Sequence, residues 1–164
     1  MTPSVLLRDI ADHDVPLVLD LNERNVELLA PLDAARLDQL STWAHRAQVI
    51  EVAGEPAGFV ITIPAGTDYD SPNYRWFSAM YGSSFHYLDR IVFEDRFRRR
   101  GLGSAVYDMI EADASTAGRL ALEVNAEPPN PASLAFHAAR GFAEVGRLGG
   151  AGKAVAMLAK DLTT

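Results

Sequence analysis

The chain has 164 residues, a formal net charge of −7 and no cysteine, and 48% of its residues are hydrophobic. This length suits one domain with its own core, so residues 1–164 are expected to form a single domain. The lack of cysteine excludes disulfides and cysteine nucleophiles, and the acidic balance argues against a nucleic-acid binder. With no apolar run of about 20 residues and no basic leader, we expect a soluble, cytoplasmic protein that does not contact membranes.

The first half of the chain alternates between strand and helix patterns. In chain order it is predicted to contain a strand (4–11), a helix capped by Asp12 (12–25), a second helix (31–44) and two strands of a hairpin around Gly54-Glu55-Pro56 (48–53 and 58–64). The next segment, 65–84, is rich in Gly, Asp, Ser and Tyr, and it predicts a long irregular loop. Its aromatic content argues against disorder.

The second half begins with 85–94, a nearly continuous apolar run typical of a central strand covered on both faces. There follow a helix (101–117), a strand (120–125), a helix with Asn130 as N-cap (130–140) and a closing antiparallel pair (142–147 and 153–162). The predicted order β-αα-βββ-α-β-α-ββ indicates an α/β (α+β) fold with a mixed sheet.

One basic segment stands out in this acidic chain. It reads Arg98-Arg99-Arg100-Gly101-Leu102-Gly103-Ser104 and lies between the apolar strand and a helix. Glycines let a ligand approach the backbone closely, and a helix N-terminus presents unpaired N–H groups, which together suit a phosphate. A Walker loop would need a lysine before Ser104, and a dinucleotide fingerprint would need glycine at Val106. The plain alternative is a basic turn whose glycines serve only the turn.

Two spaced motifs resemble those of the GNAT N-acetyltransferase superfamily. They are Arg98-x-x-Gly101-x-Gly103 after Leu88–Phe93, and Asn130-x-x-Ser133-x-x-Phe136-His137-x-x-x-Gly141-Phe142. The loop from Asp68 to Phe77 is similar to a subgroup of small predicted acetyltransferases. This resemblance implies a GNAT-like, mostly antiparallel mixed sheet with helices on both faces.

The resemblance also implies acetyl-CoA as cofactor and no metal. Main-chain amides of the turn would hold the diphosphate, and main-chain groups of the preceding strand would pair with the pantetheine arm. The implied cofactor-binding residues are Ile91, Val92, Phe93, Arg98, Arg99, Arg100, Gly101, Leu102, Gly103, Ser104, Asn130, Ser133 and His137. The guanidinium groups of Arg96, Arg99 and Arg100 either reach the adenosine phosphates or are simply solvated.

Acyl transfer to an amine needs a base, because an alkyl amine has a pKa near 10.4. Asp89, an acid inside an apolar strand, is the first candidate; the alternative is an ion pair with a structural arginine. Glu123 is the second candidate, or it faces solvent or pairs with Arg119 or Arg147. His137 stands where the family usually carries a tyrosine acid, so it is either the acid or a packing residue. If His137 is a packing residue, the remaining candidates to protonate the leaving thiolate are Tyr87, Tyr107 and solvent.

Aromatic and carboxylate side chains together suit a cationic amine with an apolar body. By resemblance, the acceptor-binding residues are Asn22, Asn25, Tyr74, Trp76 and Glu123, although Trp76 could equally anchor a lid. The predicted function is therefore acetyl-CoA-dependent transfer of an acyl group to a primary amine of a small molecule or protein. The alternative is a non-catalytic CoA-binding module of the same fold. Dimers are common in the family that the sequence resembles, and a homodimer is expected on that ground alone.

Overall fold

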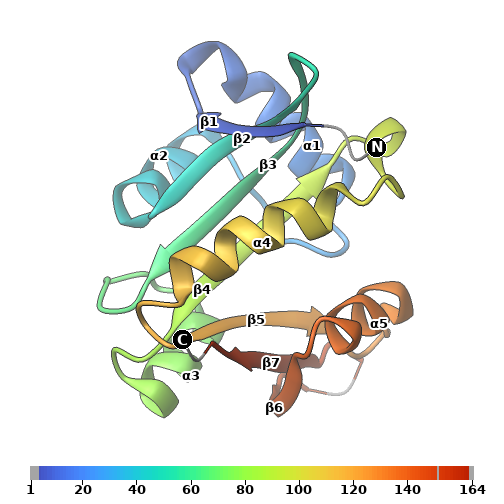
Figure 1. Cartoon of the computed structure of the whole chain (residues 1–164). Helices are drawn as coiled ribbons and strands as arrows, with labels where there is room; N and C mark the ends of the chain where they lie inside the picture. The colour runs from blue at the N-terminus through green and yellow to red at the C-terminus, as the bar shows by residue number, and fades with distance from the viewer. Residues whose placement is uncertain (1–3, 151, 163–164) are drawn as a thin grey trace. The chain divides into compact units, whose positions relative to one another are not determined.

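Residues 4–150 and 152–162 are described by the computed structural model (Figure 1). The strands are β1 (Val5–Asp9), β2 (Arg46–Val52), β3 (Glu55–Pro64), β4 (His86–Phe93), β5 (Arg119–Asn125), β6 (Ala143–Leu148) and β7 (Val155–Asp161). The helices are α1 (Val15–Arg24), α2 (Ala34–Trp43), α3 (Pro72–Tyr81), α4 (Leu102–Ala114) and α5 (Pro131–Ala139), with short 3-10 turns η1 (Asp12–Asp14) and η2 (Asp95–Phe97).

The strands are hydrogen-bonded in the order β1-β2-β3-β4-β5-β7-β6. The pairs β1–β2, β2–β3, β5–β7 and β6–β7 are antiparallel, whereas β4 and β5 run parallel. The predicted mixed, mostly antiparallel sheet is confirmed. By internal contacts the chain divides into two units. The first unit comprises the residues up to Pro64 together with Leu88–Ile110. The second unit comprises Ala65–Tyr87 together with the residues from Glu111 onward.

In the first unit, the hairpin of β2 and β3 is tighter than predicted. Only Ala53 and Gly54 lie between the strands, and both have positive φ, 52° and 79°. A two-residue turn with positive φ at both positions matches the twist of the flanking strands. The strands therefore extend through Glu55 and Pro56, which were expected to belong to the turn.

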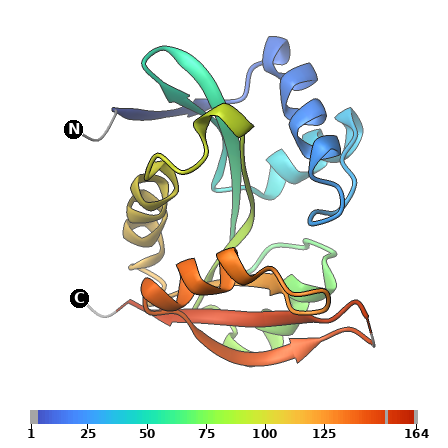
Figure 2. The same ribbon diagram turned by 90° about the vertical axis from the view of Figure 1, so that its right-hand side faces the viewer.

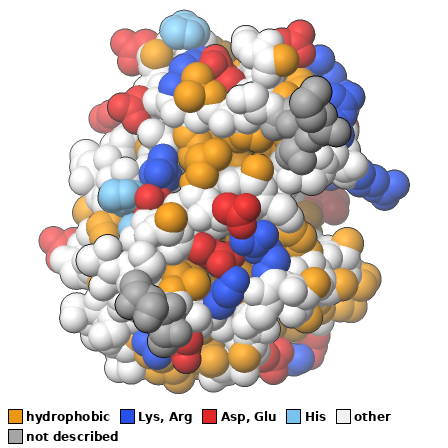
Figure 3. All heavy atoms as spheres, in the orientation of Figure 1, with side chains coloured by type: hydrophobic (Ala, Val, Ile, Leu, Met, Phe, Trp, Pro, Cys, Tyr) orange, Lys and Arg blue, Asp and Glu red, His pale blue; other side chains and the backbone are white. Residues whose placement is uncertain are grey.

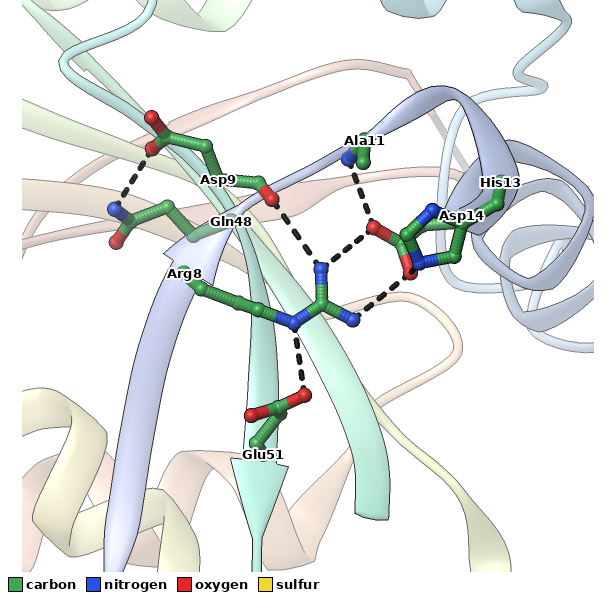
Figure 4. Close-up of polar contacts among 7 residues, drawn as sticks. All are labelled: Arg8, Asp9, Ala11, His13, Asp14, Gln48 and Glu51. Atoms are coloured by element: carbon green, nitrogen blue, oxygen red, sulfur yellow. Dashed lines mark hydrogen bonds and ion pairs between the residues drawn. The ribbon is translucent and has the colours of Figure 1, made fainter. Parts of the chain in front are cut away.

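The predicted helix 12–25 is divided into η1 and α1, and Asp12 is not its cap. The reason is Asp14, whose buried carboxylate bonds outside the helix (Figure 4). The carboxylate accepts hydrogen bonds from Arg8 Nη1 at 2.7 Å, from Arg8 Nη2 at 2.9 Å and from the main-chain N–H of Ala11 at 2.8 Å. Arg8 Nε also donates to Glu51 on β2 at 2.8 Å. The hydrogen bonds from Arg8 are the main reason that the pKa of Asp14 falls to about 2.

Helix α2 begins three residues later than predicted. The carboxylate of Asp33 accepts the N–H of Arg36 at 2.7 Å, which makes Asp33 the N-cap. Pro31 therefore lies in the connection between α1 and α2 and not in the first turn of the helix.

In the second unit, the prediction of an irregular loop over 65–84 is wrong, because α3 occupies its middle. Ser71 caps this helix by accepting the N–H of Tyr74 at 3.3 Å, Pro72 lies in its first turn, and Gly82 ends it at φ 61°. Tyr74 and Phe77 are buried one helical turn apart. The predicted element order therefore lacks one helix.

The remainder of the second unit follows the predicted order. Strand β7 pairs with β5 from Arg119↔Asp161 to Asn125↔Val155, and with β6 on its other side. Figure 2 shows α5 running beside β7. Helix α4 ends at Ala114 and not at residue 117, with a turn closed by Gly118 N–H to the Ala114 carbonyl at 3.0 Å. Among the described residues no helix is long and apolar enough to span a bilayer.

Candidate functional site

The predicted phosphate-binding turn forms between η2 and the start of α4. Residues 98–101 are exposed, and Arg99 and Gly101 have φ of 63° and 74°. A Cβ at Gly101 would have no heavy atom within 4 Å, so the space around it is open. The N–H of Ala105 bonds to the Gly101 carbonyl at 3.4 Å, which places the N-terminus of α4, the end of a helix that favours anions, directly after this open space. The exposed turn and the open space at Gly101 therefore leave room for an anion at this end of α4.

The arginines around the turn have different partners. Arg98 Nη2 donates to Asn25 Oδ1 at 2.8 Å, and Arg96 Nη1 donates to Glu55 at 3.2 Å. The guanidinium groups of Arg96 and Arg100 lie 4.4 and 5.4 Å from the centre of the Phe97 ring. Arg96 thus forms an ion pair at the surface, and the adenosine-phosphate role remains a prediction for Arg96, Arg99 and Arg100.

Strand β4 presents its main-chain groups alternately to its two edges. A Cβ on Gly58 of β3 would lie 2.0 Å from the Val92 carbonyl oxygen, and the N–H of Glu94 bonds to the Ala57 carbonyl at 2.8 Å. The main-chain groups of Val92 therefore face β3. Those of its neighbours Ile91 and Phe93 point to the opposite edge. Val92 is not available for the predicted cofactor contact through its main chain, whereas Ile91 and Phe93 are directed as that prediction requires.

The faces of β4 also differ in burial. Leu88, Arg90 and Val92 are buried, whereas Asp89, Ile91 and Phe93 are only partly buried as whole residues. The prediction that both faces are covered therefore holds only for the beginning of this strand. The expected common face of Asp89, Ile91 and Phe93 is present.

Asp89 is bonded to its neighbour in the sequence. Its Oδ2 accepts Arg90 Nε at 2.6 Å, and the two side chains are 5% and 4% exposed. Arg90 Nη1 donates further to Asn22 Oδ1 at 3.0 Å and to the Ala30 carbonyl at 3.2 Å. The structure thus contains the arginine pair that was the alternative for Asp89, and the base role of Asp89 stays a prediction.

The two asparagines predicted to bind the acceptor hold the polypeptide around α1. Asn22 is fully buried, and its Nδ2 donates to the Ala30 carbonyl at 3.0 Å. Asn25 donates to the Leu21 carbonyl at 2.8 Å while its oxygen accepts Arg98. Both side chains are engaged within the protein, and Asn22 has no exposed surface to offer a substrate.

In the second unit, Glu123 of β5 meets Tyr87 of β4. The Tyr87 hydroxyl donates to Glu123 Oε2 at 2.6 Å. The expected alternatives, Arg119 and Arg147, pair instead with Asp161 at 3.0 Å and Glu144 at 3.2 Å. Figure 3 shows positive and negative side chains mixed on the face that it presents. Glu123 is partly exposed as a whole residue.

Tyr74 and Trp76 belong to the packing of α3. Tyr74 is 1% exposed, its ring lies 5.5 Å from that of Tyr87, and its hydroxyl bonds to Thr67 Oγ1 at 3.0 Å. The Trp76 ring occupies the space of a side chain at Gly146 on β6, where a Cβ would lie 2.4 Å from Trp76 Cζ2. Both aromatics therefore have structural partners, which agrees with the anchoring alternative for Trp76.

The motif at α5 brings three predicted residues together. Asn130 Oδ1 caps the helix by accepting the N–H of Ser133 at 3.3 Å, and His137 Nδ1 lies 2.7 Å from the Ser133 carbonyl. A carbonyl only accepts, so Nδ1 carries the proton. His137 is 5% exposed, between the rings of Phe136 and Phe142, and burial lowers its pKa. The neutral imidazole has no proton at Nε2, which disfavours the acid role; that role stays an untested prediction.

Two positions with clear structural roles were not predicted. Arg90 was not singled out, although an arginine within an apolar strand is itself a signal of a buried polar contact. Gly58 lies at a bulge between β2 and β3, and only a glycine allows the close approach to Val92.

Comparison with known proteins supports the resemblance found in the sequence. A family model described as "Acetyltransferase (GNAT) family" matches residues 15–142. No curated protein matches the sequence closely enough to serve as a relative.

Solved structures share the fold at low sequence identity. Ard1 from Thermoplasma volcanium is 18% identical with a TM-score of 0.73, covering 96% of this chain and 97% of its own. An N-acetyltransferase from Staphylococcus aureus Mu50 is 18% identical with a TM-score of 0.70, covering 97% and 99%. A ribosomal-protein-alanine N-acetyltransferase from Brucella melitensis is 20% identical with a TM-score of 0.67, covering 96% and 99%.

Proposed function

This chain belongs to the acetyltransferase (GNAT) family, and from that premise we propose that it uses acetyl-CoA to acylate a primary amine of a small molecule or protein. The observation that carries the proposal is the exposed turn 98–101 at the start of α4. Its exposure, the open space at Gly101 and its place at a helix N-terminus suit the diphosphate of CoA. No group of three potential metal ligands occurs among the described residues, and the proposed chemistry requires none.

The cofactor would engage this chain mainly through the backbone. The amides from Arg99 to Ser104 bind the diphosphate, and the main-chain groups of Ile91 and Phe93, which point away from β3, bind the pantetheine arm like an added strand. Bound in this way, CoA supplies the activated acyl group as a thioester.

The transfer forms a C–N bond and breaks the C–S bond of the thioester. The attacking amine must lose a proton, and a positioned base contributes about 10²–10⁴-fold to the rate. We assign this proton to Glu123, because the residue is partly exposed and its carboxylate accepts a hydrogen bond from the Tyr87 hydroxyl and not from a buried cation. Asp89 is the less suitable acceptor, because its oxygen is already bonded to the buried guanidinium of Arg90.

The leaving sulfur also needs a proton. A simple thiol has a pKa of about 8.5, so at pH 7 solvent can protonate the thiolate without a dedicated side chain. His137 is buried with its proton directed to the Ser133 carbonyl, and its lowered pKa keeps it neutral. Solvent is therefore the proposed proton donor.

Calorimetry with acetyl-CoA tests the binding step. Gly103→Glu should weaken binding at least tenfold, because it adds a negative charge to the first turn of α4. Gly150→Glu is the matched control, because it adds the same charge at an open surface position, and it should leave the affinity unchanged. Equal affinities for the wild type and Gly103→Glu would refute the proposed phosphate site.

Thiol release then tests the transfer step. Three amines serve as probes: spermidine, a peptide with a free N-terminal alanine, and an N-terminally blocked peptide with an internal lysine. Amine-dependent release of CoA with at least one probe is expected. Tight binding of acetyl-CoA with no release for any amine would instead favour the non-catalytic CoA-binding module.

A further inference from the structure

Arg90 is a buried cation that the proposed chemistry does not use. It lies in β4 and is 6% exposed. Its guanidinium donates to Asp89, to Asn22 and to the main-chain carbonyl of Ala30. Asn22, itself fully buried, donates to the same carbonyl at 3.0 Å. One main-chain oxygen thus accepts two buried side-chain donors.

Ala30 belongs to the α1–α2 connection, residues 25–33, which contains no helix or strand. Most of this connection is exposed, including Val26 at 38% and Leu28 at 52%. Its first residue, Asn25, is bonded to Arg98 of the turn. An exposed, irregular segment is therefore attached at two points: to the turn through Asn25, its first residue, and to β4 through Ala30.

Packing alone does not explain an arginine at position 90. Taking a guanidinium out of water is costly, and apolar residues of similar volume often replace buried ion pairs without loss of stability. An arginine does supply directed hydrogen bonds to several acceptors at once, which no apolar side chain can. Here the acceptors come from three segments: β4, α1 and the α1–α2 connection.

We propose that Arg90 is a positioning residue for acyl transfer: it holds the α1–α2 connection and Asp89 in fixed places on β4, and so controls how well the amine is placed. This inference rests on the proposed function. The connection is bonded both to the turn that would hold the diphosphate and to the strand that would hold the thioester arm, and in this proposal its exposed residues 26–29, between the two bonds, contact the incoming amine. A misplacement of about 1 Å in such a contact can cost about 100-fold in rate.

The test compares Arg90→Met and Arg90→Lys with the wild type. Arg36→Met on α2 is the matched control, because Arg36 bonds to Gln39 of its own helix. Hydrogen exchange of the 25–33 amides reports on the connection, calorimetry reports on acetyl-CoA affinity, and thiol release with the three probe amines gives KM and kcat for the acceptor.

For Arg90→Met we expect exchange in the connection to be at least tenfold faster and the acceptor KM to be at least tenfold higher, with the acetyl-CoA Kd within twofold. Arg90→Lys keeps the charge but cannot reach all three acceptors, so its values should be intermediate. Arg36→Met should match the wild type. Should Arg90→Met fold poorly, the double variant Arg90→Met/Asn22→Leu, with both buried partners apolar, takes its place.

Two results would overturn the inference. Unchanged exchange in the connection would show that Arg90 does not hold it, with the proposed function left intact. A loss of acetyl-CoA affinity as large as the rise in acceptor KM would show a general effect on the fold. Failure of the wild type to bind acetyl-CoA is a separate outcome, because it refutes the proposed function and the catalytic part of this inference together, whatever the exchange rates are.

Discussion

The carboxylate of Asp14 offers a quantitative test of the packing between β1, β2 and η1. In the folded protein it accepts two hydrogen bonds from Arg8 and one from Ala11, and its side chain is 4% exposed. These bonds lower the pKa of Asp14 from 3.8 to about 2. Since one pKa unit corresponds to about 1.4 kcal/mol, the difference would contribute about 2.5 kcal/mol. Arg8 is 30% exposed, so screening by solvent reduces the expected contribution to about 1–2 kcal/mol.

Asp14→Asn should therefore lower the free energy of unfolding by about 1–2 kcal/mol at pH 7, as measured by urea denaturation. Because the folded pKa lies below the unfolded one, the contribution is complete above pH 4 and is lost as the pH falls towards 2. The two proteins should converge over that range. Asp9→Asn is the control, because Asp9 accepts from Gln48 at the surface, and it should change stability by less than about 0.5 kcal/mol. An equal cost of Asp14→Asn at pH 7 and pH 2.5 would refute the reasoning.

Three further predictions concern the candidate site and its support. Glu123→Gln should lower kcat by about 10²–10⁴ with little change in acetyl-CoA affinity, and a larger loss in Asp89→Asn would return the base role to that residue. Because burial lowers the pKa of His137, its contribution to stability should be complete above pH 6.5 and be lost as the pH falls below that value. His137→Gln should remove this dependence, and it should retain kcat, whereas a collapse of kcat would restore the predicted acid. Gly146→Ala should cost about 1–3 kcal/mol, because its Cβ would overlap the Trp76 ring. Combining it with Trp76→Ala should remove that cost, and simple additivity of the two changes would contradict the contact.

Hydrophobic alternation and turn residues were enough to place all seven strands and four of the five helices. The turn at 98–101 was also predictable, because glycine spacing after an apolar strand and before a helix is a local feature of the chain. The helix within 65–84 was missed even though Ser71 and Pro72 are an N-cap signal. Its Gly, Asp and Ser content favours a loop, whereas burial of Tyr74 and Phe77 decides for the helix.

The chemistry around the site was decided by contacts between distant parts of the chain. Arg90 meets Asn22 and Ala30 at separations of 68 and 60 residues, and Tyr87 meets Glu123 at 36. The sequence alone determined which residues could ionise or donate, because that is a property of each side chain. Only the tertiary structure decided which of them are paired, buried or neutral, because hydrogen bonding and desolvation depend on neighbours that the local sequence does not contain.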